Sequence, residues 1–375
     1  MSKTVAPNFS PDFSVVICTY NGALKLPALL ERLSASEGIA SEALTQIDDK
    51  RNTKRDDAST PSFDGGFSWE IVVVDNNSSD ATAEVVHEAQ KTWPASIPLR
   101  YCFEPSQGLA FARRRAIKET KSPLIGFLDD DTLPAPSWVS AAFTFGQQHP
   151  NVGAYGSSIQ GLYEVSPPPN FHRIACCLAI IDRGSEPFQY SARAGVLPAG
   201  AGMVIRRQAW LDQVPEQPAL AGVKAGSLSA KGEDVETLSY IRQAWPIWHN
   251  PAMKLFHLIP RDRLERDYLL HLFWQIGLSR YPLRKLRYAS WQWPLMVLLY
   301  FVSDMRKGLS YLFRWYWCNV IKGHFIVAFN TTLDTVEACE IALLFSSLLS
   351  PFYAPLRQRQ GRWQRTDIST DPHVC

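Results

Sequence analysis

The sequence lacks several features that would assign it to a particular class of protein. None of its seven cysteines forms a CxxC pair, and Cys176 and Cys177 are merely adjacent. The spacing therefore favours free thiols over a disulfide framework or a structural zinc site. The formal net charge is only +2, which selects neither a strongly acidic nor a strongly basic partner. The 375 residues are 46% hydrophobic and 20% charged, a composition that excludes a disordered, coiled-coil or collagen-like chain.

A long hydrophobic run is also missing. The longest one, Trp293 to Val302, ends before Asp304 and Arg306, whereas a membrane-spanning helix needs about 20 apolar residues. Residues 1–12 are polar and contain prolines, with no basic stretch that leads into an apolar one, so no secretory signal is visible. We therefore expect a cytoplasmic protein without a transmembrane helix, and contact with the inner face of the plasma membrane remains open.

What the chain does contain is an alternation of strand and helix patterns. Short β-branched or fully apolar runs predict strands, and apolar residues at helical spacing predict the helices between them. The predicted strands are Phe13–Tyr20, Glu70–Asp75, Leu99–Phe103 and Leu124–Leu128. Helical stretches are predicted at Leu24–Leu33, up to Gln90, and at Gly108–Glu119. This order predicts an α/β fold in which helices flank a doubly wound, mostly parallel sheet.

Two of the predicted strands end in carboxylates. Asp75 follows the second strand, and Asp129, Asp130 and Asp131 follow the fourth. In a parallel sheet these ends meet at one edge, where ligands bind. Clustered carboxylates repel one another unless they share a cation, and oxygen ligands of this kind favour Mg²⁺ or Mn²⁺. We therefore predict a divalent-cation site at this edge, the alternative being an ordinary acidic turn or helix cap.

Six short motifs then follow one another in an order known from one enzyme family. They are VVICTYN (15–21), VVVDNNSS (72–79), QGLAFAR (107–113), FLDDDT (127–132), PAGAGM (198–203) and GEDVE (232–236). In their order and spacing the chain resembles the family 2 glycosyltransferases of the GT-A fold. Within that family it looks most like the cyanobacterial hormogonium polysaccharide biosynthesis glycosyltransferases, chiefly through residues 126–154.

The resemblance also implies a domain organisation. It covers residues 13–260, which are expected to form the GT-A catalytic domain behind an N-terminal tail at 1–12. Residues 35–68 are charged and rich in Ser, Thr and Gly, and they predict a flexible surface insertion in that domain. The remaining residues, 261–375, are expected to form a C-terminal helical appendage.

The reaction that the resemblance implies is an inverting transfer of a sugar from a nucleotide-diphosphate-sugar donor to a glycan or lipid-linked acceptor hydroxyl. A bound Mn²⁺ or Mg²⁺ would assist it, with Asp131 and His257 at the metal. His257 lies on an apolar run, so a purely structural role is its alternative. The implied donor-binding residues are Thr19, Tyr20, Asn21, Asp75, Arg113, Asp129, Asp130, Gly200, Ala201 and Arg263. Arg263 suits a diphosphate because a guanidinium binds two oxygens at once, although it could be an ordinary solvated charge.

The candidate catalytic pair is Glu233 and Asp234, because an attacking hydroxyl must lose its proton to a positioned base. The resemblance assigns the base to Asp234, whereas Glu233 would orient or bind the acceptor. The alternative is an acidic cluster at the start of a helix, where the macrodipole favours it. Two residues depart from the family pattern, since Arg114 and Gly202 stand where Asn is usual.

The segment from Arg280 to Trp317 has seven Lys or Arg but one acidic residue, Asp304, interleaved with nine Tyr or Trp. This mixture is typical of peripheral contact with an anionic membrane, and a helical subdomain packed on the core is the alternative. The apolar runs around it disfavour nucleic acid. Two other functions compete with the enzyme: a catalytically silent membrane-bound scaffold and a Mg²⁺-dependent phospho-acceptor domain. The latter needs only about 120 residues.

Overall fold

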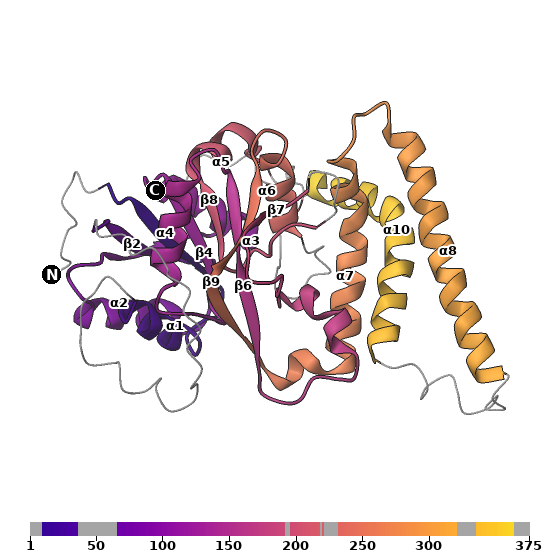
Figure 1. Ribbon diagram of the computed structural model, residues 1–375, viewed down its shortest axis with the longest axis horizontal. Coiled ribbons are helices and arrows are strands. Elements are labelled where there is room, and N and C mark those ends of the chain that lie inside the picture. The colour runs from indigo at the N-terminus through magenta and orange to yellow at the C-terminus, as the bar shows by residue number, and fades with distance from the viewer. Residues whose placement is uncertain are drawn as a thin grey trace, which may run out of the picture. The chain divides into compact units, whose positions relative to one another are not determined.

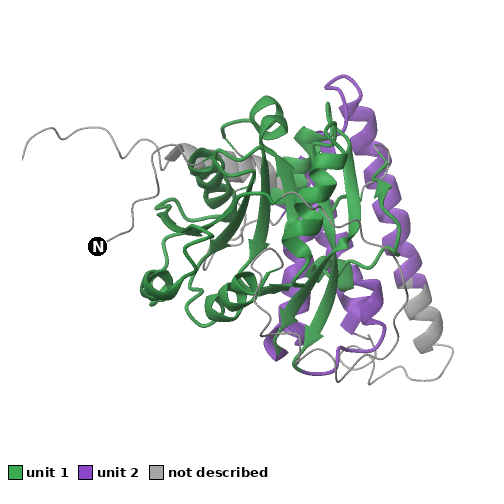
Figure 2. Cartoon of the chain, turned by 60° about the vertical axis from the view of Figure 1, so that its left-hand side comes forward, with its two compact units in different colours: residues 1–164, 175–224, 233–260 green, residues 165–174, 225–232, 261–375 purple. Residues whose placement is uncertain are grey.

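The computed structural model describes residues 10–36, 66–191, 196–217, 220, 232–320 and 335–363 (Figure 1). The chain forms two compact units (Figure 2). Unit 1 comprises residues 1–164, 175–224 and 233–260, and unit 2 comprises residues 165–174, 225–232 and 261–375. Most of the predicted tail (1–12) and of the predicted insertion (35–68) lies outside the described residues. The predicted domain boundaries stay a prediction.

The first half of unit 1 is a parallel sheet with helices between its strands. Its four strands are β1 (Phe13–Thr19), β2 (Trp69–Asp75), β3 (Leu99–Phe103) and β4 (Leu124–Asp129). The connecting helices are α1 (Leu26–Ser34), α2 (Thr82–Thr92) and α3 (Leu109–Glu119). Strand β1 pairs in parallel with both β2 and β4, and β2 pairs in parallel with β3. Every residue of β1 and β2 is buried, as continuous apolar runs with both faces covered require.

The second half of unit 1 extends this sheet with pairings of both directions. Its strands are β5 (Thr132–Pro134), β6 (Ala154–Tyr163), β7 (Phe188–Gln189), β8 (Met203–Arg206) and β9 (Ile247–Ile259). The spatial order is β3-β2-β1-β4-β8-β6-β9-β5, and β7 also pairs with β9. Strand β8 is antiparallel to β4 and β6, whereas β6 and β9 are parallel. The predicted α/β sheet flanked by helices is confirmed, although antiparallel pairs join its second half.

Two apolar layers cover the sheet, and the alternation of side chains along β1 assigns them. Val15 and Ile17 pack into one layer with α1, α2 and α4 (Trp138–Gln148). Val16 faces the other layer with α3, α5 (Arg207–Gln213) and α6 (Glu233–Ile241). A β-strand continuously apolar in sequence therefore contributes to both layers, which fixes β1 at the centre of the parallel half.

His249 on β9 is fully buried beside the ring of Phe188, and neither of its ring nitrogens has a hydrogen-bond partner among the described residues. Burial, together with the nearby Arg183, lowers its pKa below 6.5. The unfolded chain therefore takes up this proton at a higher pH than the folded chain, and the free energy of unfolding falls as the pH drops below about 6.5. We expect His249→Phe to weaken this acid sensitivity in urea titrations between pH 7.5 and 5, and an unchanged pH profile would contradict the assignment.

Unit 2 is helical, which confirms the predicted C-terminal helical region. Its helices are α7 (Arg266–Lys285), α8 (Trp293–Val320) and α10 (Thr335–Trp363), with the short turns η2 (Phe171–Arg173) and η4 (Arg261–Leu264). Helix α10 packs against both α7 and α8 and lies between them (Figure 1). Within the described part of the chain, no helix combines the length and the apolar character that crossing a bilayer requires.

A close approach of α7 and α10 depends on Gly277. A Cβ atom at this position would lie 1.7 Å from Ser346 Oγ and 2.7 Å from the carbonyl oxygen of Leu343. We expect Gly277→Ala to lower the free energy of unfolding by about 1–3 kcal/mol, because the helices must separate. Gly308 on α8 is the matched control, since nothing lies within 4 Å of its added Cβ. Gly308→Ala should stabilise by up to about 1 kcal/mol. Equal thermal denaturation of the two variants would refute the packing argument.

Candidate active site

The strand register brings the sequence-predicted residues to one edge of unit 1. Asp75 at the end of β2 pairs directly with Thr19 at the end of β1. On the other side of β1, Asp129 at the end of β4 pairs with Cys18. Because all three strands are parallel, their carboxyl ends open onto the same crevice above the sheet.

Asp75 is almost fully buried and is held in one orientation. One carboxylate oxygen accepts a hydrogen bond from the backbone N–H of Ser78 at 2.9 Å, and the other accepts one from the Tyr101 hydroxyl at 2.7 Å. The next residue, Asn76, accepts a hydrogen bond from the N–H of Gly108 at 2.7 Å, which ties the end of β2 to the start of α3. The loop after β2 is thereby pre-organised around its carboxylate.

Asn21 closes the turn after β1. Its backbone has a positive φ of 52°, which Asn tolerates better than most residues. Its side-chain oxygen accepts a hydrogen bond from the N–H of Ser79 at 2.9 Å, so the first two motifs are joined. Tyr20 and Asn21 are exposed. A planar ligand could therefore stack on the Tyr20 ring without a rearrangement of the turn.

The three consecutive aspartates have different surroundings. Asp130 accepts a hydrogen bond from the Thr19 hydroxyl at 2.7 Å and pairs with Lys25 at 3.1 Å. Among the described residues Asp129 has no such ion pair, and its enclosure, followed by the charge of Asp131, raises its pKa to about 6. Carboxylates this close repel one another, and a cation shared between them would relieve that repulsion.

Asp131 and His257 face each other at the far side of this cluster. Strand β5 pairs with β9 so that Thr132 lies opposite His257, and His257 Nε2 lies 3.4 Å from Asp131 Oδ1. His257 Nδ1 lies 2.8 Å from the carbonyl oxygen of Leu178, which can only accept. Nδ1 therefore carries a proton and donates it to this carbonyl, which fixes the orientation of the ring and turns Nε2 toward Asp131.

This pair of donors fits a divalent cation. A histidine that donates its other ring nitrogen to a carbonyl is the usual arrangement of a metal ligand. Mg²⁺ and Mn²⁺ take one or two protein carboxylates and complete their shell with phosphate oxygens and water. Among the described residues no group of three or more His, Cys, Asp or Glu is placed to hold a metal. Asp131 and His257 could thus supply only part of a coordination shell, and a bound ligand or water would have to supply the rest.

Asp234 lies at the start of α6, and both of its carboxylate oxygens are positioned by backbone N–H groups. Oδ2 accepts from Gly200 at 2.9 Å, and Oδ1 accepts from Val235 at 2.8 Å. A Cβ atom at position 200 would lie 3.0 Å from Asp234 Cβ and 2.4 Å from Arg113 Nη2. Gly200 is therefore needed for Asp234 and Arg113 to approach each other, and the neighbouring Ala201 is buried beside it.

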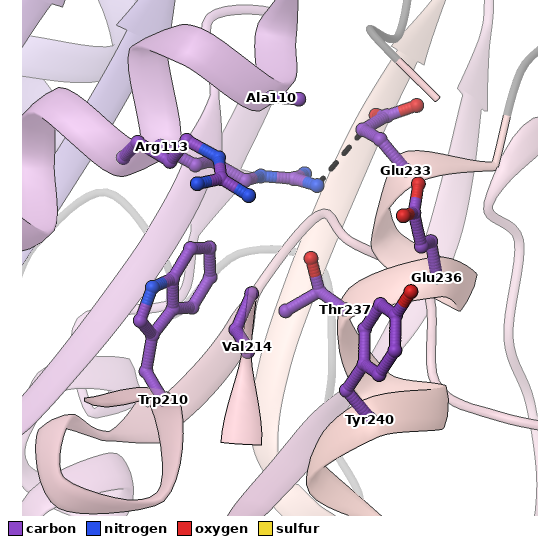
Figure 3. Close-up of a pocket in the computed structure, with 9 residues that line it drawn as sticks. Ala110, Arg113, Trp210, Val214, Glu233, Glu236, Thr237 and Tyr240 are labelled. Atoms are coloured by element: carbon purple, nitrogen blue, oxygen red, sulfur yellow. Dashed lines mark ion pairs between the residues drawn. The ribbon is translucent and has the colours of Figure 1, made fainter. Parts of the chain in front are cut away.

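Arg113 is close to both the aspartate at the end of β4 and the acidic pair at the start of α6. Its side chain is 2% exposed and points from α3 toward α6, where its Nη1 lies 3.6 Å from Glu233 Oε1 (Figure 3). Burial would lower its pKa, but the charges of Glu233, Asp129 and Asp234 together raise it. Its Nε and Nη1 are buried without a hydrogen-bond partner among the described residues. The small cavity beside it holds about 10 Å³, room for about one water molecule and not for a nucleotide.

The two departures from the family pattern have local structural explanations. Arg114 donates hydrogen bonds to the backbone carbonyls of Pro215 and Glu216, so it holds the loop after α5. Gly202 has a positive φ of 67°, and a Cβ atom there would lie 2.5 Å from Ser157 Oγ. An Asn would tolerate that backbone conformation but would collide with Ser157. Neither position is available for the usual family contact.

Arg263 belongs to unit 2, where it is half-buried in the η4 turn, and its predicted contact with the donor stays a prediction. Two groups of the site escaped the sequence analysis, namely Lys25 and the carbonyl of Leu178. Lys25 lies in the turn between β1 and α1, and no pattern marks it. The Leu178 carbonyl is a backbone group 79 positions from His257, so only the folded chain reveals it.

Lys25 provides a prediction about the site without its metal. Its ammonium pairs with Asp130 and lies 4.0 Å from Asp131. In Lys25→Met the three clustered carboxylates lose this neighbouring positive charge, and their mutual repulsion remains. Because the pair is half-exposed, we expect the free energy of unfolding of the metal-free protein to fall by up to about 1 kcal/mol. Stabilisation by Mn²⁺ should become larger in thermal denaturation. Lys91→Met, which removes an exposed pair with Glu88, is the control, and an equal response of both variants would contradict the role of Lys25.

Comparison with known proteins shows which family and which solved structures the chain resembles. The family model for "Glycosyl transferase family 2" matches residues 14–210, and no curated protein matches the chain in sequence. A mannosyltransferase from Pyrobaculum calidifontis, PcManGT, solved with GDP-Man and Mn²⁺, superimposes with a TM-score of 0.50 at 17% identity over 91% of this chain and 88% of that one. S. aureus TarS 1–349 in complex with UDP has a TM-score of 0.44 at 15% identity, over 71% of this chain. The chain spans 65% of the length of that TarS structure.

The family model covers more than half of the chain, and the fold shared with PcManGT agrees with the GT-A architecture that the motifs predicted. The chain belongs to glycosyl transferase family 2.

Proposed function

We propose that this protein is an inverting glycosyltransferase, which moves a sugar from a nucleotide-diphosphate-sugar donor to a hydroxyl of a glycan or lipid-linked acceptor. One observation carries the proposal: Arg113 lies 3.6 Å from Glu233, and a Cβ atom at Gly200 would touch both Arg113 and Asp234. The residues expected to bind the donor and those expected to act on the acceptor therefore share one charged site. PcManGT contains GDP-Man, and TarS structures contain UDP or UDP-GlcNAc, which supports a donor of this class.

The donor would lie over the carboxyl ends of β1, β2 and β4. Asp75, with its carboxylate fixed by Ser78 and Tyr101, is proposed to accept hydrogen bonds from the nucleotide base. Asp129 is proposed to bind the ribose hydroxyls, and the exposed Tyr20 ring to cover the base. Gly200 and Ala201 are proposed to line the sugar. Position 200 must remain glycine, because a larger side chain there collides with Arg113.

Asp131 and His257 are the residues proposed to hold Mn²⁺ or Mg²⁺. When bound, the cation supplies positive charge to the diphosphate that leaves the sugar. The chain's own contribution is to orient His257 through the contact of its Nδ1 with the Leu178 carbonyl. It also places the carboxylates of Asp129 and Asp131 close enough for each to feel the other's charge.

Asp234 is the proposed general base. Two backbone N–H groups fix its carboxylate, and a carboxylate held in this way can take the proton of an acceptor hydroxyl as that hydroxyl attacks the sugar. Direct attack from the face opposite the diphosphate inverts the configuration. Glu233, which is paired with Arg113, is proposed to orient the acceptor.

The proposal also includes a more specific role, in polysaccharide biosynthesis of the type found in the hormogonium group. It rests on the resemblance of residues 126–154 alone. A transfer assay with oligosaccharide and lipid-linked acceptors tests it, because a polysaccharide-building enzyme should extend a glycan and leave simple alcohols unused.

The primary test is a thermal-shift panel of UDP- and GDP-sugars with and without Mn²⁺, followed by assay of the stabilising donor for transfer. A ligand that binds only the folded protein raises its stability by mass action. We expect one nucleotide class to stabilise the protein, and more strongly with Mn²⁺. Stabilisation without turnover on any acceptor would favour the silent scaffold. The absence of any shift would refute the proposed donor site.

A further inference from the structure

The exposed side of α8 is apolar, although this helix belongs to a described region in which no helix could cross a bilayer. The exposed apolar side chains of this helix recur at helical spacing. They are Leu295, Leu298, Leu299, Phe301, Val302, Met305, Leu309 and Phe313. Over this stretch the helix rises by about 27 Å, so a long apolar face is presented to the surroundings.

The packed side of α8 has the opposite character. Asp304, the one acidic residue of this helix, is only 2% exposed. It accepts hydrogen bonds from Arg284 of α7 at 2.8 and 3.3 Å and from the Ser347 hydroxyl of α10 at 3.0 Å. The guanidinium of Arg284 also lies 4.2 Å from the ring centroid of Tyr300. Charged and aromatic polar groups therefore fill the contact between α7, α8 and α10.

Helix α10 repeats this pattern. Ser346, Ser347 and Ser350 are buried on its packed side, whereas Phe345 and Leu349 are exposed. Small residues such as Gly277 allow α7 and α10 to approach closely. A helix in water places its apolar residues inside and its polar residues outside. Helices in contact with lipid do the reverse, with small and ionisable residues paired within the bundle. Apolar side chains such as Phe273 and Leu344 are buried in unit 2 as well, so the pattern expected beside lipid is confined to α8 and to the serine-lined side of α10.

The charges around the α8 face favour lipid over a second copy of the chain. Lys285, Arg306 and Lys307 are exposed, and α8 has no exposed acidic residue. In a two-fold symmetric dimer the same face meets itself, and α8 has no exposed acidic residue that could pair there with Arg306 or Lys307. Trp291, which is 80% exposed just before α8, is the type of side chain that settles at the headgroup level of a bilayer. Cations and an aromatic anchor beside an apolar face together match an anionic lipid surface.

We propose that the exposed face of α8 binds the surface of an anionic lipid bilayer. The helix lies in the plane of the headgroups with its leucine and valine side chains toward the acyl chains, and Arg306 and Lys307 contact lipid phosphates. This docking uses residues of unit 2 alone and does not depend on the glycosyl transfer proposed for unit 1.

The test is sedimentation of the full-length protein with phosphatidylcholine vesicles, made with and without phosphatidylglycerol. We expect wild-type protein to sediment with the anionic vesicles. The double variant Val302→Glu/Leu309→Glu, at positions 55% and 59% exposed, should lose vesicle affinity by about tenfold or more. Arg306→Gln/Lys307→Gln should lose the preference for anionic lipid. Leu211→Glu, at a 51% exposed position on α5 of unit 1, is the matched control and should sediment like wild type.

Three outcomes would overturn the proposal: wild-type protein that stays in the supernatant, a Val302→Glu/Leu309→Glu variant that binds vesicles as well as wild type, or equal losses in Leu211→Glu. A wild-type dimer that this variant dissociates, without vesicle binding by either, would assign the face to a second copy. Nucleotide stabilisation measured on the same preparations separates the two proposals, because it reports unit 1 whichever way the vesicle experiment ends.

Discussion

The Asp234→Asn variant is expected to lose glycosyl transfer by about 10²–10⁴-fold, the usual contribution of a general base. An amide cannot take the proton of the acceptor hydroxyl. The substitution changes neither the size of the side chain nor the position of α6, because its oxygen can still accept one of the two hydrogen bonds from Gly200 and Val235. Donor affinity should therefore stay close to that of wild type, and the loss should appear in kcat.

The measurement combines steady-state transfer with donor binding by calorimetry. Asp212→Asn on α5 makes the same chemical change at an exposed position, and it should transfer at the wild-type rate. If Asp234→Asn turned over at the wild-type rate, Asp234 would not be the general base. A parallel loss of donor affinity and turnover would instead show that Asp234 only supports the Gly200 loop, with the proton taken by another group.

The parallel half of the fold was predictable because β1, β2 and β4 are largely apolar runs bounded by clear turn residues. The runs that end at Asp75 and Asp129 had to be strands covered on both faces, and parallel pairing then brings these ends together. The antiparallel β8, only four residues from Met203 to Arg206, has no such signal. Its place between β4 and β6 is set by packing, which a local pattern does not report.

Within the site, the sequence predicted which residue types come together but not how each is held. It placed Arg113 among the donor-binding residues but did not show which way its side chain points, because three arginines in succession carry no direction. The turn of α3 resolves this: Arg113 is buried against Glu233, and Arg114 reaches the loop after α5. The orientation of the His257 ring is a second example, since it depends on a carbonyl from a distant loop.

Composition suggests a lipid-facing side for α8 but does not assign it to a particular face of the helix. The segment from Arg280 to Trp317 is basic and aromatic along its whole length, so it fits a packed subdomain and a membrane surface equally well. Only the burial of Asp304 with Arg284, opposite the exposed Val302 and Leu309, shows which side of α8 is free to meet lipid.

Asp131→Asn is expected to separate two effects of opposite sign. Without metal, removal of one charge relieves the repulsion that helps to raise the pKa of Asp129 to about 6, so the variant should be more resistant to thermal denaturation than wild type at neutral pH. With metal, the variant loses the carboxylate that faces His257 Nε2. Since residues that merely support metal ligands cost about 10–100-fold in metal affinity, we expect a loss of about 100-fold or more in Mn²⁺ affinity.

Mn²⁺ binding followed by electron paramagnetic resonance, without any sugar acceptor, measures the second effect directly, and donor binding should weaken with it. The matched control is Asp130→Asn, because Asp130 is already engaged by Thr19 and Lys25. It should bind Mn²⁺ within about tenfold of wild type, the range of a supporting residue. If Asp131→Asn kept wild-type Mn²⁺ affinity while Asp130→Asn lost it, the metal would belong on the Thr19 side of the cluster, and the assignment of His257 would fall with that of Asp131.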